Sequence, residues 1–137
     1  MIAGTGIDLV AIGAFAAQLA DRASRFAAAT FTDAERAYCE SAASKQPAQH
    51  LAARYAAKEA AVKALDEACG RAQLDHPALP LTDIEVIRDA RGRPALMLHG
   101  AARALAERLH VDRAFLSLSH DGDYATAMVT LETLTAR

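Results

Sequence analysis

Apolar side chains along the chain follow two different spacings, which separate predicted strands from predicted helices. Residues 6–10 are apolar and β-branched around one carboxylate, Asp8, and this pattern predicts an early strand. From Phe15 to Phe26 the large apolar groups recur near the helical period, which predicts a first helix. Thr32 and Glu35 have the spacing of a capping box, so a second helix is expected to begin there.

The strongest helical pattern covers residues 49–69, which are rich in alanine, leucine, glutamate and lysine. Gly70 follows where a left-handed C-terminal cap is expected. Two prolines predict that residues 71–82 form a connecting loop. Beyond it, residues 84–88 and 95–98 flank an Arg-Gly turn and are predicted to pair as a hairpin, with Pro94 at the start of the second strand.

A second hairpin is predicted near the end of the sequence. Residues 114–119 and 124–129 flank Asp121-Gly122, a favoured turn dipeptide, after a short alanine-rich helix at 100–109. This order of elements lacks the regular strand–helix alternation of a parallel sheet, so we predict an α+β fold in which a largely antiparallel sheet packs with helices. A length of 137 residues without a dividing linker indicates a single domain, 1–137.

Composition restricts the partners of the protein. A formal net charge of −2 gives no global reason to bind nucleic acid or an anionic membrane. No apolar run approaches the roughly 18 residues of a membrane span, and the first residues lack the features of a signal peptide. The isolated Cys39 and Cys69 indicate free thiols and a cytoplasmic location. With 5% aromatic residues the core is thin, and association between subunits would bury further apolar surface.

Two places in the sequence put charged side chains where chemistry is conceivable. Asp8 interrupts an apolar strand, so its carboxylate needs solvent at a strand edge, a partner or a metal. In the central helix Tyr55, Glu59 and Lys63 share one face at four-residue spacing, and Arg54 and Lys58 lie on the adjacent face. An exposed helix with a Glu59–Lys63 ion pair would explain this pattern, but the surrounding alanines would also leave room for a large ligand.

Other polar motifs carry weaker signals. Ser117 and Ser119 share a strand face, and His120 follows at the turn, so these groups could bind phosphate. They could also form a nucleophile pair or only cap the turn, and of these two we favour turn capping. Arg93 fits a solvated turn. The other histidines show no metal-ligand spacing, and the sequence has no Walker loop, GxGxxG motif or zinc-type cluster.

Four segments taken in order nevertheless resemble the holo-acyl-carrier-protein synthase family of phosphopantetheinyl transferases. They are GIDLV at 6–10, FTDAE at 31–35, RYAAKEA at 54–60 and LSLSH at 116–120. The resemblance spans nearly the whole chain. It implies a 4′-phosphopantetheinyl transferase-like fold and an enzyme that transfers the 4′-phosphopantetheine arm of coenzyme A to a serine of an apo-acyl carrier protein, with release of 3′,5′-ADP and a need for Mg²⁺ or Mn²⁺.

The resemblance also implies roles for individual residues. Asp8 and Glu59 would bind the metal, which suits the preference of Mg²⁺ for a few carboxylate oxygens. Glu59 would remove the serine proton itself or orient a water molecule on the metal, and Lys63 would face the phosphates, which makes Glu59, Asp8 and Lys63 the catalytic set. The expected coenzyme A contacts are, in decreasing order, Lys63, Arg54, Lys58, Arg93, Ser119 and His120.

Relatives of this length are typically homotrimers with the site at the subunit interface, so we expect a homotrimer here. Many of them carry a basic residue just after the GID strand, whereas residues 11–14 are uncharged in this chain. Carrier recognition would then use Arg22 or Arg25, or the carrier would be less acidic. The carrier could serve fatty acid biosynthesis and lipid metabolism, polyketide synthesis or another pathway.

Two other functions fit the same residues. One is a catalytically silent coenzyme A or carrier-protein binding subunit of the same fold, against which the presence of both carboxylates argues. The other is a metal-dependent pyrophosphate hydrolase, which would use similar acids with a positioned water and would not need a carrier protein.

Overall fold

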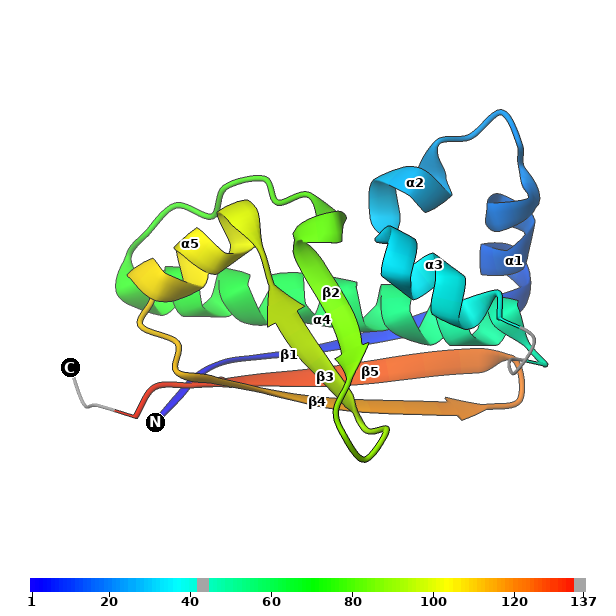
Figure 1. Ribbon diagram of the computed structural model, residues 1–137. Coiled ribbons are helices and arrows are strands. Elements are labelled where there is room, and N and C mark those ends of the chain that lie inside the picture. Colours follow the sequence, from blue (N-terminus) through cyan, green and yellow to red (C-terminus); the bar gives the residue numbers. More distant parts are fainter. Residues whose placement is uncertain (42–44, 135–137) are drawn as a thin grey trace.

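The computed structural model of the protein describes residues 1–41 and 45–134, and we refer to its elements by their order along the chain (Figure 1). Helices and strands alternate irregularly, with a short 3₁₀ turn, η1, before the second strand. Their bounds are β1 (Ile2–Ala11), α1 (Ile12–Ala20), α2 (Phe26–Thr30), α3 (Asp33–Cys39), α4 (Pro47–Ala72), η1 (Leu81–Asp83), β2 (Ile84–Arg88), β3 (Pro94–Leu98), α5 (Gly100–Arg108), β4 (Arg113–Asp121) and β5 (Tyr124–Glu132).

The strands form two separate antiparallel sheets. One has three strands in the order β1-β5-β4, and the other is the β2–β3 hairpin. The predicted α+β class and both predicted hairpins are confirmed, but the strands divide between two sheets and do not form one. Gly122 takes a positive φ of 55° in the β4–β5 turn, and Pro94 stands at the first position of β3, where its missing N–H disturbs the pairing least.

The long helix α4 lies along one face of the three-stranded sheet, with α1, α2 and α3 near one end and α5 near the other (Figure 1). Ala60, Ala64 and Ala68 of this helix are buried where it packs against β1. A Cβ atom on Gly6 would stand 1.9 Å from the carbonyl oxygen of Ala60, and one on Gly4 would stand 2.1 Å from that of Ala64. Gly4 and Gly6 therefore let the strand approach the helix closely, and the buried alanines fill this contact, so the prediction that they leave room for a ligand was wrong.

The helix predicted from Phe15 to Phe26 is broken in the structure. Asp21 accepts a hydrogen bond from the Ala23 N–H, and the Ser24 hydroxyl accepts one from the Phe26 N–H. Such local side-chain bonds compete with helix continuation, so α1 ends at Ala20 and α2 begins at Phe26. The periodic aromatic residues still meet, because the chain folds back and brings the rings of Phe15 and Phe26 to 5.8 Å between centroids.

The ends of the other helices follow local chemistry. The capping box predicted at Thr32 and Glu35 is confirmed. Gly70 was predicted to end the long helix but lies inside it, because Gln73 adopts the left-handed conformation with a φ of 57°. The Leu74 N–H then donates to the Cys69 carbonyl and closes the turn. Among the described residues, no helix combines the length and apolarity needed to cross a membrane.

Candidate active site

The acidic pocket is a cavity of about 290 Å³ between β1, α1 and α4. It contains the side chains of Asp8 from β1 and of Glu59 from α4, and so brings together the two carboxylates singled out in the sequence. The lining residues are Asp8, Leu9, Val10, Ala11, Ala14, Phe15, Gln18, Tyr55 and Glu59.

The local packing explains why these two acids meet. Asp8 has the same strand parity as Gly4 and Gly6, so its side chain projects toward α4. The two glycines hold the helix against the strand, and Glu59 precedes Ala60, which Gly6 contacts. The side chain of Asp8 is only 18% exposed, so exposure at a strand edge does not account for this carboxylate even though β1 is an edge strand.

Lys63 lies beside the acidic pocket, where it contacts Asp8 and lines a neighbouring cavity next to β1. Its ammonium donates to the carboxylate of Asp8 at 3.2 Å and to the carbonyl of Ile7 at 2.9 Å. The lysine therefore pairs with Asp8 on another element and not with Glu59 along the helix, as the exposed-helix alternative would require. Its side chain is 55% exposed, so the ammonium can also reach a ligand in solvent.

The electrostatics of the pocket favour a bound cation. Burial raises the pKa of Glu59, and the nearby negative charge of Asp8 raises it further, against the opposite effects of Lys63 and Tyr55. A cation between the two carboxylates would remove this repulsion. Residues 1–41 and 45–134 hold no group of three or more His, Cys, Asp or Glu side chains arranged for a metal. Two carboxylates are nevertheless enough for Mg²⁺, which keeps water and substrate oxygens in its shell.

The ring of Tyr55 forms part of the wall of the acidic pocket. Its centroid lies 5.6 Å from that of Phe15 and 5.5 Å from that of Phe26, which ties α4 to α1 and α2. Burial raises the pKa of the Tyr55 phenol, and the charges of Glu59 and Asp8 add to this effect. The phenol therefore stays neutral beside the carboxylates and can act as a hydrogen-bond donor.

A second cavity, of about 210 Å³, lies between α4 and the β2–β3 hairpin, and we call it the arginine pocket. The guanidinium groups of Arg54 and Arg88 each lie 4.9 Å from the ring centroid of Tyr38. Arg54 is 6% exposed and donates to the His50 carbonyl at 3.2 Å, while its Nε is buried without a hydrogen-bond partner. The lining residues are Tyr38, His50, Arg54, Arg88, Gly92, Pro94 and Leu118.

The arginine pocket is electropositive. Within the part of the chain that the structure describes, no carboxylate forms an ion pair with Arg54 or Arg88. Burial lowers the pKa of His50, and the charges of Arg54 and His120 lower it further. Two guanidinium groups without a carboxylate partner, one of which has an unpartnered Nε–H, suit an anion such as a phosphate.

Sequence reasoning found Arg54 but missed Arg88 and Tyr38. Arg88 follows Ile84 and Val86 at two-residue spacing along β2, on the face that those two residues bury, although Arg88 itself is exposed. A cation in this alternating position is the signal that would have indicated Arg88. Tyr38 carries no comparable signal, because its role depends on the packing of α3 against α4.

The other predicted contacts lie in different places. Arg93 is exposed in the β2–β3 turn and pairs with Asp89 at 2.7 Å. His120 is close enough to His50 to lower its pKa. Ser119 pairs with Thr126 across the sheet and has the opposite strand parity to His120, so one chain does not assemble the Ser–His nucleophile pair.

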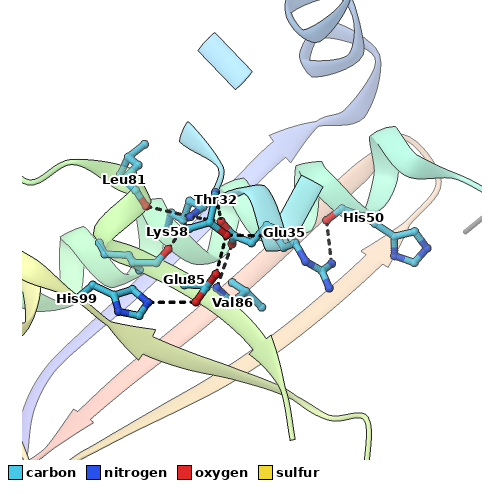
Figure 2. A network of polar contacts seen from close by, with 10 residues as sticks. Thr32, Glu35, His50, Lys58, Leu81, Glu85, Val86 and His99 are labelled. Atoms are coloured by element: carbon cyan, nitrogen blue, oxygen red, sulfur yellow. Dashed lines mark hydrogen bonds and ion pairs between the residues drawn. The ribbon is translucent and has the colours of Figure 1, made fainter. Parts of the chain in front are cut away.

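Lys58 does not join the predicted contacts to coenzyme A. Its side chain is fully buried, and its ammonium is held by Glu35 and by the carbonyls of Leu81 and Ile84 (Figure 2). These three acceptors use all the protons of an ammonium group. Its predicted role as a ligand contact is corrected, because no donor remains for a phosphate.

The fold and these two pockets define a protein of the 4′-phosphopantetheinyl transferase superfamily. The family model matches residues 4–129, and the chain belongs to this superfamily. It is 44% identical over 132 residues to the holo-[acyl-carrier-protein] synthase of Geobacter metallireducens, over 96% of this chain and 98% of that one. Identity to the synthase of Nocardia farcinica is 46% over 133 residues, covering 96% and 88%.

Solved structures agree with this assignment. The coenzyme A complex of the ACPS from Chronobacterium ammoniagenes matches the fold with a TM-score of 0.79 and 38% sequence identity, over 96% of this chain and 98% of that one. The family predicted from the four sequence segments is therefore confirmed.

Proposed function

We propose that the protein transfers the 4′-phosphopantetheine arm of coenzyme A to a serine of an apo-acyl carrier protein and releases 3′,5′-ADP, in a reaction that needs Mg²⁺ or Mn²⁺. The observation that carries this proposal is the acidic pocket, where Asp8 and Glu59 meet beside the exposed ammonium of Lys63. The names of the relatives and the coenzyme A complex of one of them support the same chemistry.

Asp8 and Glu59 would hold the metal ion, because their carboxylates line one pocket and raise its affinity for a cation. When bound, the ion would neutralise charge on the pyrophosphate of coenzyme A. Lys63 is placed to bind a phosphate oxygen once its contact with Asp8 is given up. The lysine and the two acids together would orient the pyrophosphate at the mouth of the pocket.

The transfer itself exchanges one phosphorus–oxygen bond for another. The carrier serine hydroxyl forms a bond to the β-phosphorus of coenzyme A, and the bond from that phosphorus to the bridging oxygen breaks, so 3′,5′-ADP leaves with that oxygen. Glu59 would accept the serine proton itself or orient a water molecule that accepts it. The nucleophile belongs to the carrier, so this chain needs none.

The arginine pocket would bind the phosphate group of coenzyme A that is not part of the pyrophosphate. Arg54 and Glu59 stand five residues apart on α4, which is about 7.5 Å along the helix axis. A nucleotide with two phosphate positions can span that distance. Arg88 joins the predicted contacts Arg54, Arg93, Ser119 and His120 in this proposal.

The open face of the three-stranded sheet supports the proposed homotrimer. α4 covers one face, whereas the other carries large apolar side chains that are each at least half exposed, namely Ile7, Leu9, Phe115, Tyr124 and Met128. Several large apolar side chains exposed on one sheet face are typical of a subunit interface. Ser119 lies on this same face of the sheet. In the proposed trimer a ligand would therefore reach Ser119 from a neighbouring subunit.

Two exposed arginines and two free thiols bear on the partner and the location of the protein. Arg22 and Arg25 are exposed in the segment between α1 and α2, close in sequence to the acidic pocket, and would contact an acidic carrier. We further propose that residues 1–137 form one domain and that it works in the cytoplasm, where the unpaired thiols of Cys39 and Cys69 would persist.

The test is intact-mass spectrometry of an apo-acyl carrier protein after incubation with coenzyme A, Mg²⁺ and the protein, with Glu59→Gln as the matched variant. We expect the carrier to gain one phosphopantetheine mass with the wild type only. Coenzyme A binding without any gain in carrier mass would favour the silent binding subunit, and pyrophosphate cleavage that does not depend on the carrier would favour a hydrolase.

A further inference from the structure

Lys58 is a fully buried cation one helical turn from Arg54. Its Nζ lies 2.7 Å from the Glu35 carboxylate, 2.9 Å from the Leu81 carbonyl and 2.6 Å from the Ile84 carbonyl (Figure 2). An ammonium group in the interior is costly unless all its protons are bonded, and here they are. The lysine thus joins the middle of α4 to the beginning of β2.

Glu35 extends this connection in two further directions. The oxygen that pairs with Lys58 also accepts from the Thr32 N–H at 2.9 Å, and the second oxygen accepts from the Val86 N–H at 3.0 Å. One carboxylate therefore links the first turn of α3, the side of α4 and the backbone of β2.

Glu85, the next residue of β2 toward its start, makes a second set of contacts. Its carboxylate accepts from the Thr32 hydroxyl at 2.6 Å and lies 3.1 Å from His99, which precedes α5 (Figure 2). Polar contacts thus hold β2 to α3, to α4 and to the start of α5.

The β2–β3 hairpin needs such an anchor. Within residues 1–41 and 45–134 its two strands pair only with each other, and an isolated hairpin of this size is marginally stable. It also carries Arg88, while α4 carries Arg54, and the two guanidinium groups meet over one Tyr38 ring. The relative position of hairpin and helix therefore sets the shape of the arginine pocket.

We propose that the Lys58–Glu35 pair is a positioning device that fixes the β2–β3 hairpin to α4 and so sets the separation of Arg54 and Arg88 for coenzyme A; the coenzyme A part rests on the proposed function. The register supports this assignment: Lys58 is four residues from Arg54 on the helix, and Val86 is two residues from Arg88 on the strand, with the same parity.

Stability alone does not explain the pair. An apolar pair of similar volume often stabilises a fold as well as a buried ion pair does, because the charges lose their hydration. An apolar pair cannot form hydrogen bonds to the backbone groups of Leu81, Ile84 and Val86. These directional bonds fix the position of β2 along α4. Lys58 is a positioning residue in this account, since it touches neither the substrate nor the reacting atoms.

The experiment uses the double variant Lys58→Met/Glu35→Gln. Lys58→Met alone would leave a buried carboxylate unpaired, whereas the added Glu35→Gln change removes that charge and keeps an amide oxygen for the Thr32 cap. Arg71→Met is the control, because Arg71 forms an exposed pair with Glu67 on the same helix. The measurements are coenzyme A affinity by calorimetry, kcat and KM for coenzyme A, and hydrogen–deuterium exchange of residues 84–98.

For the double variant we expect affinity for coenzyme A to fall by about 10- to 100-fold, the scale of a misplaced binding group. KM for coenzyme A should rise with kcat changed much less, and exchange should quicken in residues 84–98 but not in β1, β5 or β4. A folded double variant with wild-type affinity and exchange would overturn the proposal, and so would a fall in kcat at unchanged KM. Wild-type protein that binds no coenzyme A would refute the proposed function, while the exchange data would still test the anchor.

Discussion

Lys63 and Asp8 meet beside the acidic pocket, with 3.2 Å between Nζ and Oδ1, although one comes from α4 and the other from β1. The contact neutralises Asp8 while no other cation is bound. A metal ion at Asp8 would compete with this pair and release the lysine toward a phosphate. Metal and coenzyme A binding should therefore assist each other through these two side chains.

Lys63→Ala should weaken coenzyme A binding, and the loss should depend on salt. We expect about a tenfold loss at low ionic strength and a much smaller one near 1 M, where the screening length falls to about 3 Å. Isothermal titration at the two salt concentrations measures this difference. Arg103→Ala is the control, as it removes an exposed cation of α5 that pairs with Glu107. Equal losses for Lys63→Ala at both salt concentrations would show a packing role.

Asp8→Asn should raise the metal concentration needed for half-maximal transfer by about tenfold or more, since a carboxylate ligand is replaced by a weaker neutral one. The melting temperature without metal should change little, because the amide keeps the size of the side chain and only the partly exposed pair with Lys63 is lost. A Mg²⁺ titration of carrier modification checks the first point and calorimetry the second. An unchanged titration would remove Asp8 from the metal site.

Glu59→Gln should stabilise the metal-free protein at high pH only. Folding raises the pKa of Glu59, so the folded state holds this proton to a higher pH than the unfolded chain does. The ionised side chain therefore lowers stability as pH rises above its ordinary pKa of about 4.3, and this penalty is complete above the raised pKa.

Melting curves in EDTA should accordingly give a higher melting temperature for Glu59→Gln than for wild type at about pH 8 and no difference at about pH 4. Added Mg²⁺ should reverse the order at high pH by stabilising the wild type alone. A variant that is less stable than wild type at both pH values would contradict the assigned cause of the pKa shift.

Local patterns predicted most of the fold, and the failures have local causes too. The capping box, both hairpins and the long helix depend on neighbours in sequence, so they could be predicted. The break after Ala20 and the extension past Gly70 depend on competing bonds made by Asp21, Ser24 and Gln73. The division of the strands into two sheets depends on packing between distant segments, which no short pattern encodes.

Prediction of the site residues from the sequence was limited for the same reason. The sequence indicated Asp8, Glu59 and Lys63 because acids and a lysine stand out against apolar neighbours. The sequence predicted that Lys58 and Arg54 both contact coenzyme A, because both are cations on one helix face. In the structure Lys58 is fully buried beside Glu35, whereas Arg54 lines the arginine pocket. Only the placement of α3 and β2 distinguishes these two roles.

Met128→Glu should prevent the proposed trimer from forming. Met128 lies in the middle strand of the open sheet face, 52% exposed, and a carboxylate there would have to lose its hydration in an interface. Sedimentation should show a single chain of 14.5 kDa for the variant and a threefold mass for the wild type. Met97→Glu, at a similarly exposed methionine of β3, should leave the mass unchanged. A wild type that sediments as one chain would refute the trimer.

Gly6→Ala should destabilise the protein by about 3 kcal/mol, the upper end of overpacking costs, because its Cβ would meet the backbone oxygen of Ala60 at 1.9 Å and neither backbone can yield alone. Gly13→Ala is the matched control: a Cβ there meets nothing within 4 Å, and alanine in α1 should stabilise by about 0.5–1 kcal/mol. Urea unfolding measures both. The folded fraction of Gly6→Ala should also need more Mg²⁺, since β1 would stand further from α4 and separate Asp8 from Glu59. Equal stability of the two variants would show that the close approach of strand and helix does not determine the spacing of the carboxylates.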